Sequence, residues 1–111
     1  MSCVAVRILA LCAALVLPAS AVVADASNVN DPGRQLFVKD ATPSCTICHT
    51  LADAGAAGNI GPSLDELKPD AARVIKALKT GIGQMPAYTQ LSDEQVQALA
   101  RYVERASGAA K

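Results

Sequence analysis

The amino-acid sequence predicts an all-α fold of three main helices joined by short turns and loops. Two segments in the second half of the chain repeat apolar residues at spacings of three and four, and a third segment opens with residues that typically begin a helix. Glycine and proline separate these segments, and no stretch alternates apolar and polar residues as a half-buried strand does. We therefore expect helices and loops alone to position the functional residues.

The first main helix is predicted in the stretch NDPGRQLFVKDA. Asp31 is suited to the N-cap, because its side chain can accept hydrogen bonds from the first backbone N–H groups of a helix. Pro32 follows at the first helical position, where the missing N–H of proline costs nothing. The sequence therefore places the start of this helix at Pro32.

The second main helix is predicted from Pro69 to Gly81, since a glycine commonly ends a helix. Before it, SCTICHTL is expected to form a short turn of helix, and the glycine-rich segment 54–63 is expected to be a loop. The predicted apolar face of the helix consists of Ala71, Val74, Ile75 and Leu78.

The third main helix is predicted in LSDEQVQALARYVERAS. Ser92 and Gln95 have the spacing of a capping box, in which each side chain bonds the backbone N–H of the other residue. A helix with a single apolar face packs that face against a core. The predicted face consists of Val96, Leu99, Ala100 and Val103.

The N-terminus has the layout of a secretory signal peptide. Arg7 supplies a positive charge, an apolar run follows over residues 8–17, and Pro18 and several small residues come after it. The apolar run is too short to cross a bilayer as a helix. A buried N-terminal helix is the alternative interpretation. We expect a signal peptide at residues 1–24.

Small residues allow cleavage after Ala21 or after Ala24, which leaves one domain at residues 25–111 with no membrane anchor after cleavage. Without the first 24 residues, the chain has 87 residues, nine basic and ten acidic side chains, and a formal charge of −1. This balance argues against a nucleic-acid partner, which a basic surface would attract. A domain this small, with one Phe, two Tyr and no Trp, needs something else to fill its core, such as a cofactor.

The residues with the most distinctive chemistry lie in the stretch SCTICHT. Cys45 and Cys48 are the cysteines that remain after signal cleavage, and His49, the only histidine of the chain, follows directly. Four interpretations fit two thiols and an imidazole at this spacing. They are a disulfide, a thiol-redox pair, a zinc site and the covalent attachment of a haem.

The first three interpretations fit poorly. A disulfide across two residues closes too small a loop to stabilise much, and it gives His49 no role. A thioredoxin-like pair is expected after a strand in a βαβ unit, and no strand is predicted. Structural zinc takes four ligands, whereas Cys45, Cys48 and His49 supply three, of which two are adjacent in sequence. The Cys-x-x-Cys-His spacing is the attachment signature of c-type haem, so we expect one haem c bound covalently to Cys45 and Cys48.

His49 and Met85 are the expected axial ligands of the haem iron. With two thioether bonds on one edge of the haem, the residue after Cys48 projects under the ring, where its imidazole can reach the iron. The chain has no second histidine, and Met1 belongs to the signal peptide, so Met85 remains as the second ligand. It lies in TGIGQMPAY, a loop stiffened by glycine and proline, and Met/His pairs ligate electron-transfer cytochromes. Gap-filling in the core is the alternative role for this methionine.

Over nearly all of its mature length, the sequence resembles the class I c-type cytochromes. The resemblance rests on CTICH, IGPSL, MPAY, an N-terminal GRQLF and a C-terminal LARYV. It implies a small cytochrome c fold wrapped around one covalent haem. It also implies that Gly33 and Phe37 of the first helix meet Leu99 and Tyr102 of the last, with Gly33 small enough to let the two helix axes approach.

The same resemblance implies that the carbonyl oxygen of Pro62 accepts a hydrogen bond from Nδ1–H of His49, which would fix the imidazole ring and raise its basicity. A narrower resemblance concerns the run CTICHTLADAGAAGNIGPSLDELKPDAARV followed by GIGQMPAY. This run is similar to small cytochromes that accept electrons from periplasmic sulfite dehydrogenases. A general-purpose electron carrier is the alternative.

These features predict a periplasmic electron carrier rather than an enzyme. It would take one electron from a dehydrogenase, such as a sulfite dehydrogenase, and pass it to an oxidase or another cytochrome. With His49 and Met85 bound, the iron has no open position for catalysis. The alternative is a haem enzyme, a peroxidase or gas-binding protein, in which Met85 dissociates, although the chain offers no second histidine as an acid–base group. The residues expected to line the haem are Ile47, Leu51, Ile60, Leu64, Leu67, Ile75, Leu78 and Ile82.

Overall fold

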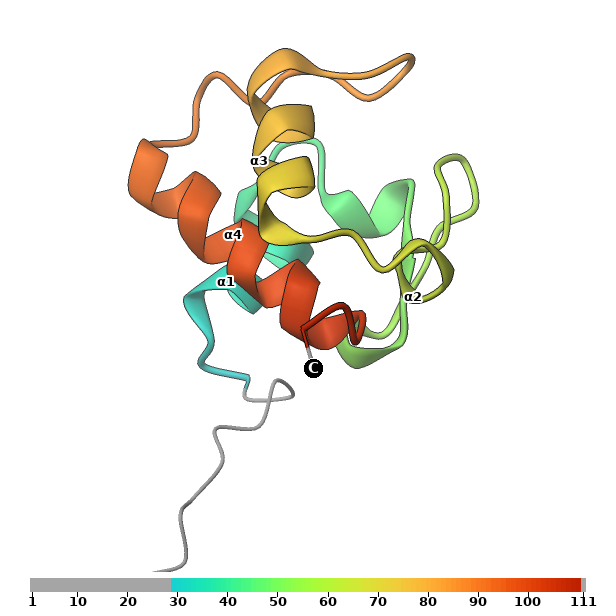
Figure 1. Ribbon diagram of the computed structural model, residues 1–111. Coiled ribbons are helices and arrows are strands. Elements are labelled where there is room, and N and C mark those ends of the chain that lie inside the picture. The colour runs from blue at the N-terminus through green and yellow to red at the C-terminus, as the bar shows by residue number, and fades with distance from the viewer. Residues whose placement is uncertain (1–28, 111) are drawn as a thin grey trace, which may run out of the picture.

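The structure is a computed structural model that describes residues 29–110. The signal peptide predicted at residues 1–24 and both candidate cleavage sites lie outside the described residues. In Figure 1, helix α4 (Asp93–Ala106) runs along one side of the molecule, against α1 (Pro32–Gln35) and α3 (Ala71–Thr80), and the remaining segments form loops and single turns. Within residues 29–110, no helix is long and apolar enough to span a membrane.

Helix α1 begins where the sequence predicts. Asp31 is the N-cap, and its Oδ1 atom accepts hydrogen bonds from the backbone N–H groups of Gly33 (2.8 Å) and Arg34 (3.3 Å). Pro32 occupies the first helical position. The chain continues without a break into η1 (Leu36–Asp40), a π-helical turn that buries Leu36 and Phe37. The predicted first helix is thus confirmed as a continuous helical segment from α1 through η1.

Helix α3 begins two residues later than predicted. Pro69 lies outside the helix and is buried, and Asp70 has an extended backbone (φ −71°, ψ 164°). Oδ1 of Asp70 accepts a hydrogen bond of 2.8 Å from the backbone N–H of Arg73. Asp70 is therefore the N-cap, a role that aspartate fills better than an interior helical position. The helix ends at Thr80, and Gly81 follows with a left-handed φ of +68°.

Helix α4 confirms the predicted capping box. The backbone N–H of Ser92 donates to Oε1 of Gln95 (2.9 Å), and the backbone N–H of Gln95 donates to Oγ of Ser92 (3.1 Å). The helix then runs from Asp93 to Ala106. Its predicted apolar face is buried in full, as Val96, Leu99, Ala100 and Val103.

The expectation that the chain forms no strand is wrong in one place. Thr50–Leu51 (β1) pairs antiparallel with Ala56–Ala57 (β2), the second of which lies in the segment predicted to be a loop. Between them, η3 (Ala52–Ala54) and the left-handed Gly55 (φ 65°) reverse the chain. Two-residue strands are too short to show an alternating pattern, so the sequence carried no signal for them. The other short elements are η2 (Cys45–Ile47) and α2 (Leu64–Leu67).

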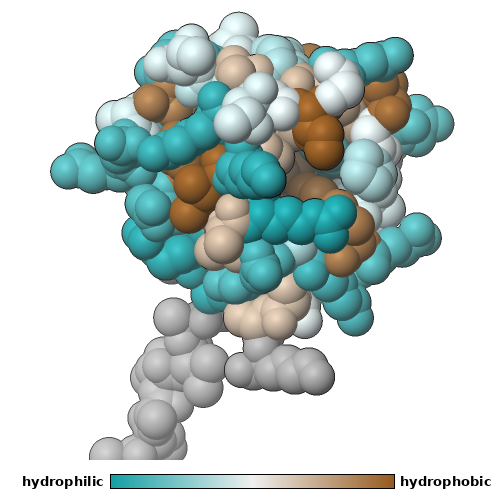
Figure 2. Space-filling model, turned by 45° about the horizontal axis from the view of Figure 1, so that its top comes forward, coloured by the Kyte–Doolittle hydropathy of each residue, from teal (hydrophilic) through white to brown (hydrophobic). Residues whose placement is uncertain are grey.

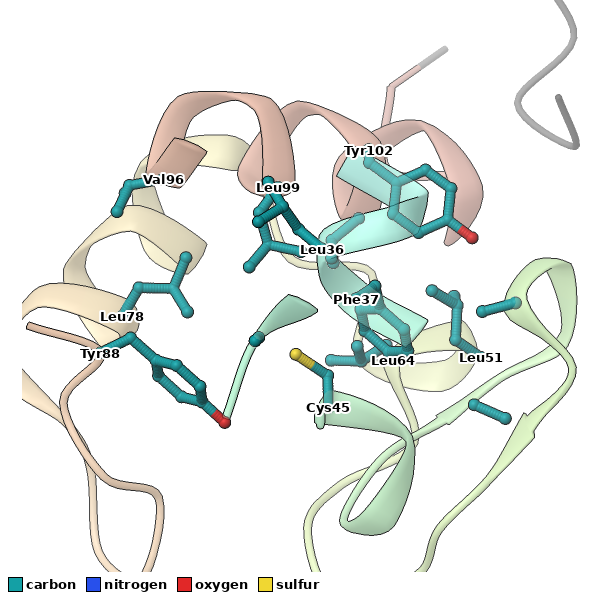
Figure 3. Close-up of a cluster of buried hydrophobic side chains, with 14 residues drawn as sticks. Leu36, Phe37, Cys45, Leu51, Leu64, Leu78, Tyr88, Val96, Leu99 and Tyr102 are labelled. Atoms are coloured by element: carbon teal, nitrogen blue, oxygen red, sulfur yellow. The ribbon is translucent and has the colours of Figure 1, made fainter. Parts of the chain in front are cut away.

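The contact between the first and last helices is confirmed. The rings of Phe37 and Tyr102 pack edge to face, with centroids 6.0 Å apart, and Leu99 belongs to the same buried cluster (Figure 3). A Cβ atom on Gly33 would collide with the backbone oxygen of Ala98 and with Cβ of Tyr102. At Gly33, α1 therefore approaches α4 so closely that only a residue without a side chain fits there.

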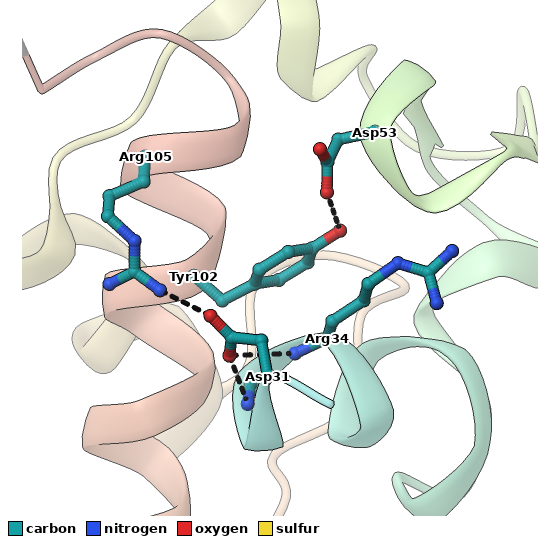
Figure 4. A network of polar contacts seen from close by, with 6 residues as sticks. Asp31, Arg34, Asp53, Tyr102 and Arg105 are labelled. Atoms are coloured by element: carbon teal, nitrogen blue, oxygen red, sulfur yellow. Dashed lines mark hydrogen bonds and ion pairs between the residues drawn. The ribbon is translucent and has the colours of Figure 1, made fainter. Parts of the chain in front are cut away.

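A polar network reinforces this helix pair (Figure 4). Arg105 of α4 forms an ion pair of 2.6 Å with Asp31, the N-cap of α1. The hydroxyl of Tyr102 donates a hydrogen bond of 2.6 Å to Oδ2 of Asp53 in η3. Burial and this bond to a carboxylate raise the pKa of Tyr102, so the hydroxyl stays protonated. The network joins α4 to both α1 and the loop that carries η3.

Candidate cofactor site

The described structure has a cavity of about 970 Å³, at the upper end of the range for cofactor pockets. Its wall is formed by residues of η1, η2, α2, α3 and α4 and of the loops between them. Figure 2 shows hydrophobic side chains gathered around a hollow on one face of the molecule, with hydrophilic side chains beside it. All four predicted site residues line this one cavity, namely Cys45, Cys48, His49 and Met85.

The two cysteines are positioned by the short helix η2. Ser44 is its N-cap, and Oγ of Ser44 accepts a hydrogen bond of 3.4 Å from the backbone N–H of Thr46. Both cysteines are free thiols; Cys45 is buried and Cys48 is half-buried. Burial raises the pKa of the Cys45 thiol to about 11. The thiolate is the reactive form of cysteine, so this burial makes the Cys45 thiol a poor nucleophile.

A zinc site has no support in the described residues. Within residues 29–110, no three His, Cys, Asp or Glu side chains come together as a group that could hold a metal ion. Structural zinc requires four such ligands. Cys45, Cys48 and His49 all line the wall of the cavity.

His49 is oriented by the hydrogen bond that the family resemblance implied. Its Nδ1 atom lies 2.8 Å from the carbonyl oxygen of Pro62. A carbonyl oxygen can only accept, so Nδ1 must carry the proton and donate it. Nε2 is then the nitrogen with a free lone pair, which a metal ion can use.

Gly61 makes the room that the His49 ring occupies. A Cβ atom on Gly61 would lie 2.7 Å from Cε1 and 3.0 Å from Nδ1 of His49. The backbone N–H of Gly61 also donates a hydrogen bond of 2.7 Å to the carbonyl oxygen of Cys48. The loop before α2 thus packs directly against the imidazole ring of His49 and limits how the ring can turn.

Met85 lies in a tight turn between α3 and α4. Ile82 and Met85 exchange two backbone hydrogen bonds of 3.0 and 2.9 Å, and Gly83 between them has a left-handed φ of +54°. A Cβ atom on Gly81 would lie 2.8 Å from the carbonyl oxygen of Met85. Met85 is half-buried and packs against the core. The geometry of this loop therefore requires glycine at positions 81 and 83.

Five of the eight predicted apolar wall residues line the cavity, and three do not. Leu51 is fully buried in the core, Ile47 is exposed, and Ile75 packs against the core away from the cavity. The cavity face of α3 includes Val74 and Ala77. Ile75 lies about 100° round the helix from Val74, on the side that faces away from the cavity. The confirmed wall residues are Ile60, Leu64, Leu67, Leu78 and Ile82.

The sequence did not predict every wall residue, and Arg73, Lys76 and Tyr88 are among those it missed. Arg73 and Lys76 line the cavity from α3, and no acidic side chain of the described residues does. Tyr88 lines it from the loop after Met85, and burial raises the pKa of its hydroxyl to about 12. The only pattern in the sequence that could have predicted Arg73 and Lys76 is their spacing. They are three residues apart and each precedes an apolar residue, Val74 or Ala77, so they lie on the same side of the helix as that pair.

Comparisons with known proteins show one matching family and one similar solved structure. The family described as cytochrome c oxidase, cbb3-type, subunit III matches residues 28–103. Among solved structures, the c-type cytochrome SorU from Sinorhizobium meliloti is 53% identical in sequence and superimposes with a TM-score of 0.68. The match covers 69% of this chain and 88% of that one. No curated protein sequence matches significantly.

Proposed function

The chain belongs to the c-type cytochromes, and we propose that it is a periplasmic one-electron carrier whose single haem c is held by Cys45 and Cys48 and ligated by His49 and Met85. The observation that carries this proposal is that these four residues, from two segments far apart in sequence, line one cavity. The hydrogen bond from His49 to Pro62 supports it further, because it leaves Nε2 free for iron. Haem supplies the Fe(II)/Fe(III) couple when it is bound.

The cavity suits a haem in size and in chemistry. Its wall is mainly apolar, as the porphyrin ring requires, and Arg73 and Lys76 would supply positive charge to balance the two haem propionates. The small cytochrome c fold would then wrap around the haem, and the haem would complete a core that contains few aromatic residues. A dry, apolar wall and methionine ligation both favour a high reduction potential.

A carrier fits this site better than an enzyme. His49 and Met85 together would leave no open position on the iron, and catalysis on a small molecule needs one. A peroxidase or gas-binding protein is the second candidate function, and it would require Met85 to leave the iron. His49 is the only histidine of the sequence, so no distal histidine remains for acid–base chemistry. The predicted signal peptide supports a periplasmic location, and so does the proposed covalent haem attachment, which in bacteria takes place outside the inner membrane.

Partner proteins would dock at the mouth of the cavity. Ile60, Leu67 and Ile82 line the cavity, yet 64%, 36% and 69% of their surfaces remain exposed. Exposed apolar side chains around a redox centre suit the small, short-lived interfaces of electron transfer. The haem edge would lie among these side chains, within reach of a donor or an acceptor.

We propose a periplasmic sulfite dehydrogenase as the electron donor and an oxidase or another cytochrome as the acceptor. The run from CTICH to MPAY supports the donor by its resemblance. The test is to mix the oxidised protein with purified periplasmic dehydrogenases and their substrates and to follow haem reduction by absorbance. We expect sulfite and its dehydrogenase to reduce the protein fastest. Faster reduction by an unrelated dehydrogenase would reject this donor.

Gly61→Ala is expected to disturb the haem iron through His49. The added methyl group must push the imidazole aside and strain its bond to Pro62. Such outer-shell bonds are worth about 10–100-fold in metal affinity or activity. A weaker Nδ1–H bond makes the imidazole a poorer electron donor, so the reduction potential should rise, as measured by redox titration.

The matched control for this change is Gly55→Asn. Gly55 has a left-handed φ of +65° with open space around it, and asparagine tolerates that conformation. This variant should keep the wild-type potential. A potential that is unchanged in Gly61→Ala would mean that the loop yields easily and that Gly61 does not fix the ring.

A further inference from the structure

Two side chains from the loop after Met85 bond to the segment just before Cys45. The hydroxyl of Tyr88 donates a hydrogen bond of 2.8 Å to the carbonyl oxygen of Pro43. Nε2 of Gln90 donates one of 2.8 Å to the carbonyl oxygen of Thr42. These partners are 45 and 48 residues apart in sequence. The two bonds thus join the two sides of the proposed haem site.

Tyr88 is well placed for such a contact. Its side chain is 6% exposed, it lines the cavity, and Figure 3 draws it close to Cys45 at the edge of the core. Its backbone N–H donates a hydrogen bond of 2.7 Å to the carbonyl oxygen of Leu78 near the end of α3. Tyr88 therefore contacts α3 through its backbone and the cysteine-bearing segment through its hydroxyl.

The rest of the loop has no comparable attachment to that segment. The other hydrogen bonds that the structure gives for residues 82–91 close the Ile82–Met85 turn, bond Tyr88 to Leu78 and bond Leu91 to Tyr88. Ile82, Gly83, Gln84 and Pro86 are exposed. Among the described hydrogen bonds, those of Tyr88 and Gln90 alone connect this loop to the chain that leads into Cys45.

We propose that Tyr88 and Gln90 are positioning residues that fasten the Met85 loop to the haem-attachment segment, and so keep Met85 at the iron when other ligands compete for it. This inference rests on the proposed ligation by Met85. The cysteine-bearing segment would fix one edge of the haem, so a loop bonded to that segment would hold its methionine at a set distance from the ring. Loss of the bonds would let the loop move outward with Met85.

The test measures competition by imidazole in the oxidised holoprotein. Imidazole added from outside can bind ferric iron only where Met85 leaves it, and absorbance reports the exchange. Tyr88→Phe and Gln90→Ala should each raise the apparent affinity for imidazole by about 2–10-fold, the range that one net hydrogen bond supports. The double variant should show a larger increase than either single variant.

Two controls separate positioning from general loss of stability. Tyr102→Phe removes the same kind of hydroxyl, whose bond goes to Asp53 away from the cavity wall. Gln97→Ala removes an exposed glutamine from α4. Urea unfolding of each variant gives its global stability. The two controls should bind imidazole as the wild type does, even where Tyr102→Phe lowers stability.

The wild type is first checked for the long-wavelength Fe–S charge-transfer band that methionine ligation produces. Absence of that band overturns the ligand assignment and the positioning role together. If the band is present, wild-type affinity for imidazole in Tyr88→Phe and Gln90→Ala overturns the positioning role alone. An equal rise in Tyr88→Phe and Tyr102→Phe overturns it as well, because the effect would then follow overall stability.

Discussion

Replacing Cys48 by alanine is expected to reduce covalently bound haem to a small fraction of the wild-type amount. Cys48 lines the cavity beside Cys45, and we propose that both thiols become thioethers to one haem. With one sulfur removed, a single thioether bond must hold the haem until His49 and Met85 bind the iron. Haem staining after denaturing electrophoresis measures what stays attached. The variant without both cysteines should show none.

Ile47→Ala is the matched control for this experiment. Ile47 lies between the two cysteines, but its side chain is 57% exposed and does not line the cavity. This variant should therefore retain its haem through electrophoresis and through extraction with acidified acetone. Haem lost from the wild type under these conditions, or fully retained without both cysteines, would contradict covalent attachment at these residues.

Gly33→Val is expected to lower the free energy of unfolding by about 1–3 kcal/mol, the usual cost of overpacking a well-packed contact. Even the first carbon of a side chain at this position would collide with the Ala98 backbone oxygen and with Cβ of Tyr102. A backbone atom cannot turn aside as a flexible side chain can. Helix α1 would have to move away from α4, and the packing of Phe37 on Tyr102 would loosen with it.

Urea unfolding of the holoprotein measures this change, and Gln35→Ala serves as its control. Gln35 lies in the same helix but is exposed, so its replacement should alter stability little. If Gly33→Val were as stable as the wild type, the two helices would not approach as closely as the structure has them. The interpretation of Gly33 as a spacing residue would then be wrong.

The features that the sequence predicted well depend on neighbours in the chain. Asp31 and Ser92 cap their helices through groups within three residues, so their roles can be read from short patterns. The apolar face of α4 follows from helical spacing alone. The Cys-x-x-Cys-His spacing is likewise local, and it led directly to the residues that line the cavity.

The features that the sequence missed depend on packing between distant segments. Ile75 shares the spacing of a core residue, but the orientation of α3 on α4 decides which of its apolar residues faces the cavity. The bond from Tyr88 to Pro43 joins residues that no spacing rule connects. The β1–β2 pair is held by a few backbone contacts in strands too short to leave a pattern. Only the folded chain reveals such features.

We propose that His49 and Met85, which line the same cavity, ligate one haem in a protein that carries electrons. The most direct test is the long-wavelength absorption of the oxidised holoprotein, where an Fe–S charge-transfer band reports methionine on the iron. We predict that the wild type shows this band, that Met85→Ala loses it, and that the neighbouring Gln84→Ala keeps it. A wild type without the band, or a band that survives in Met85→Ala, would contradict the claim.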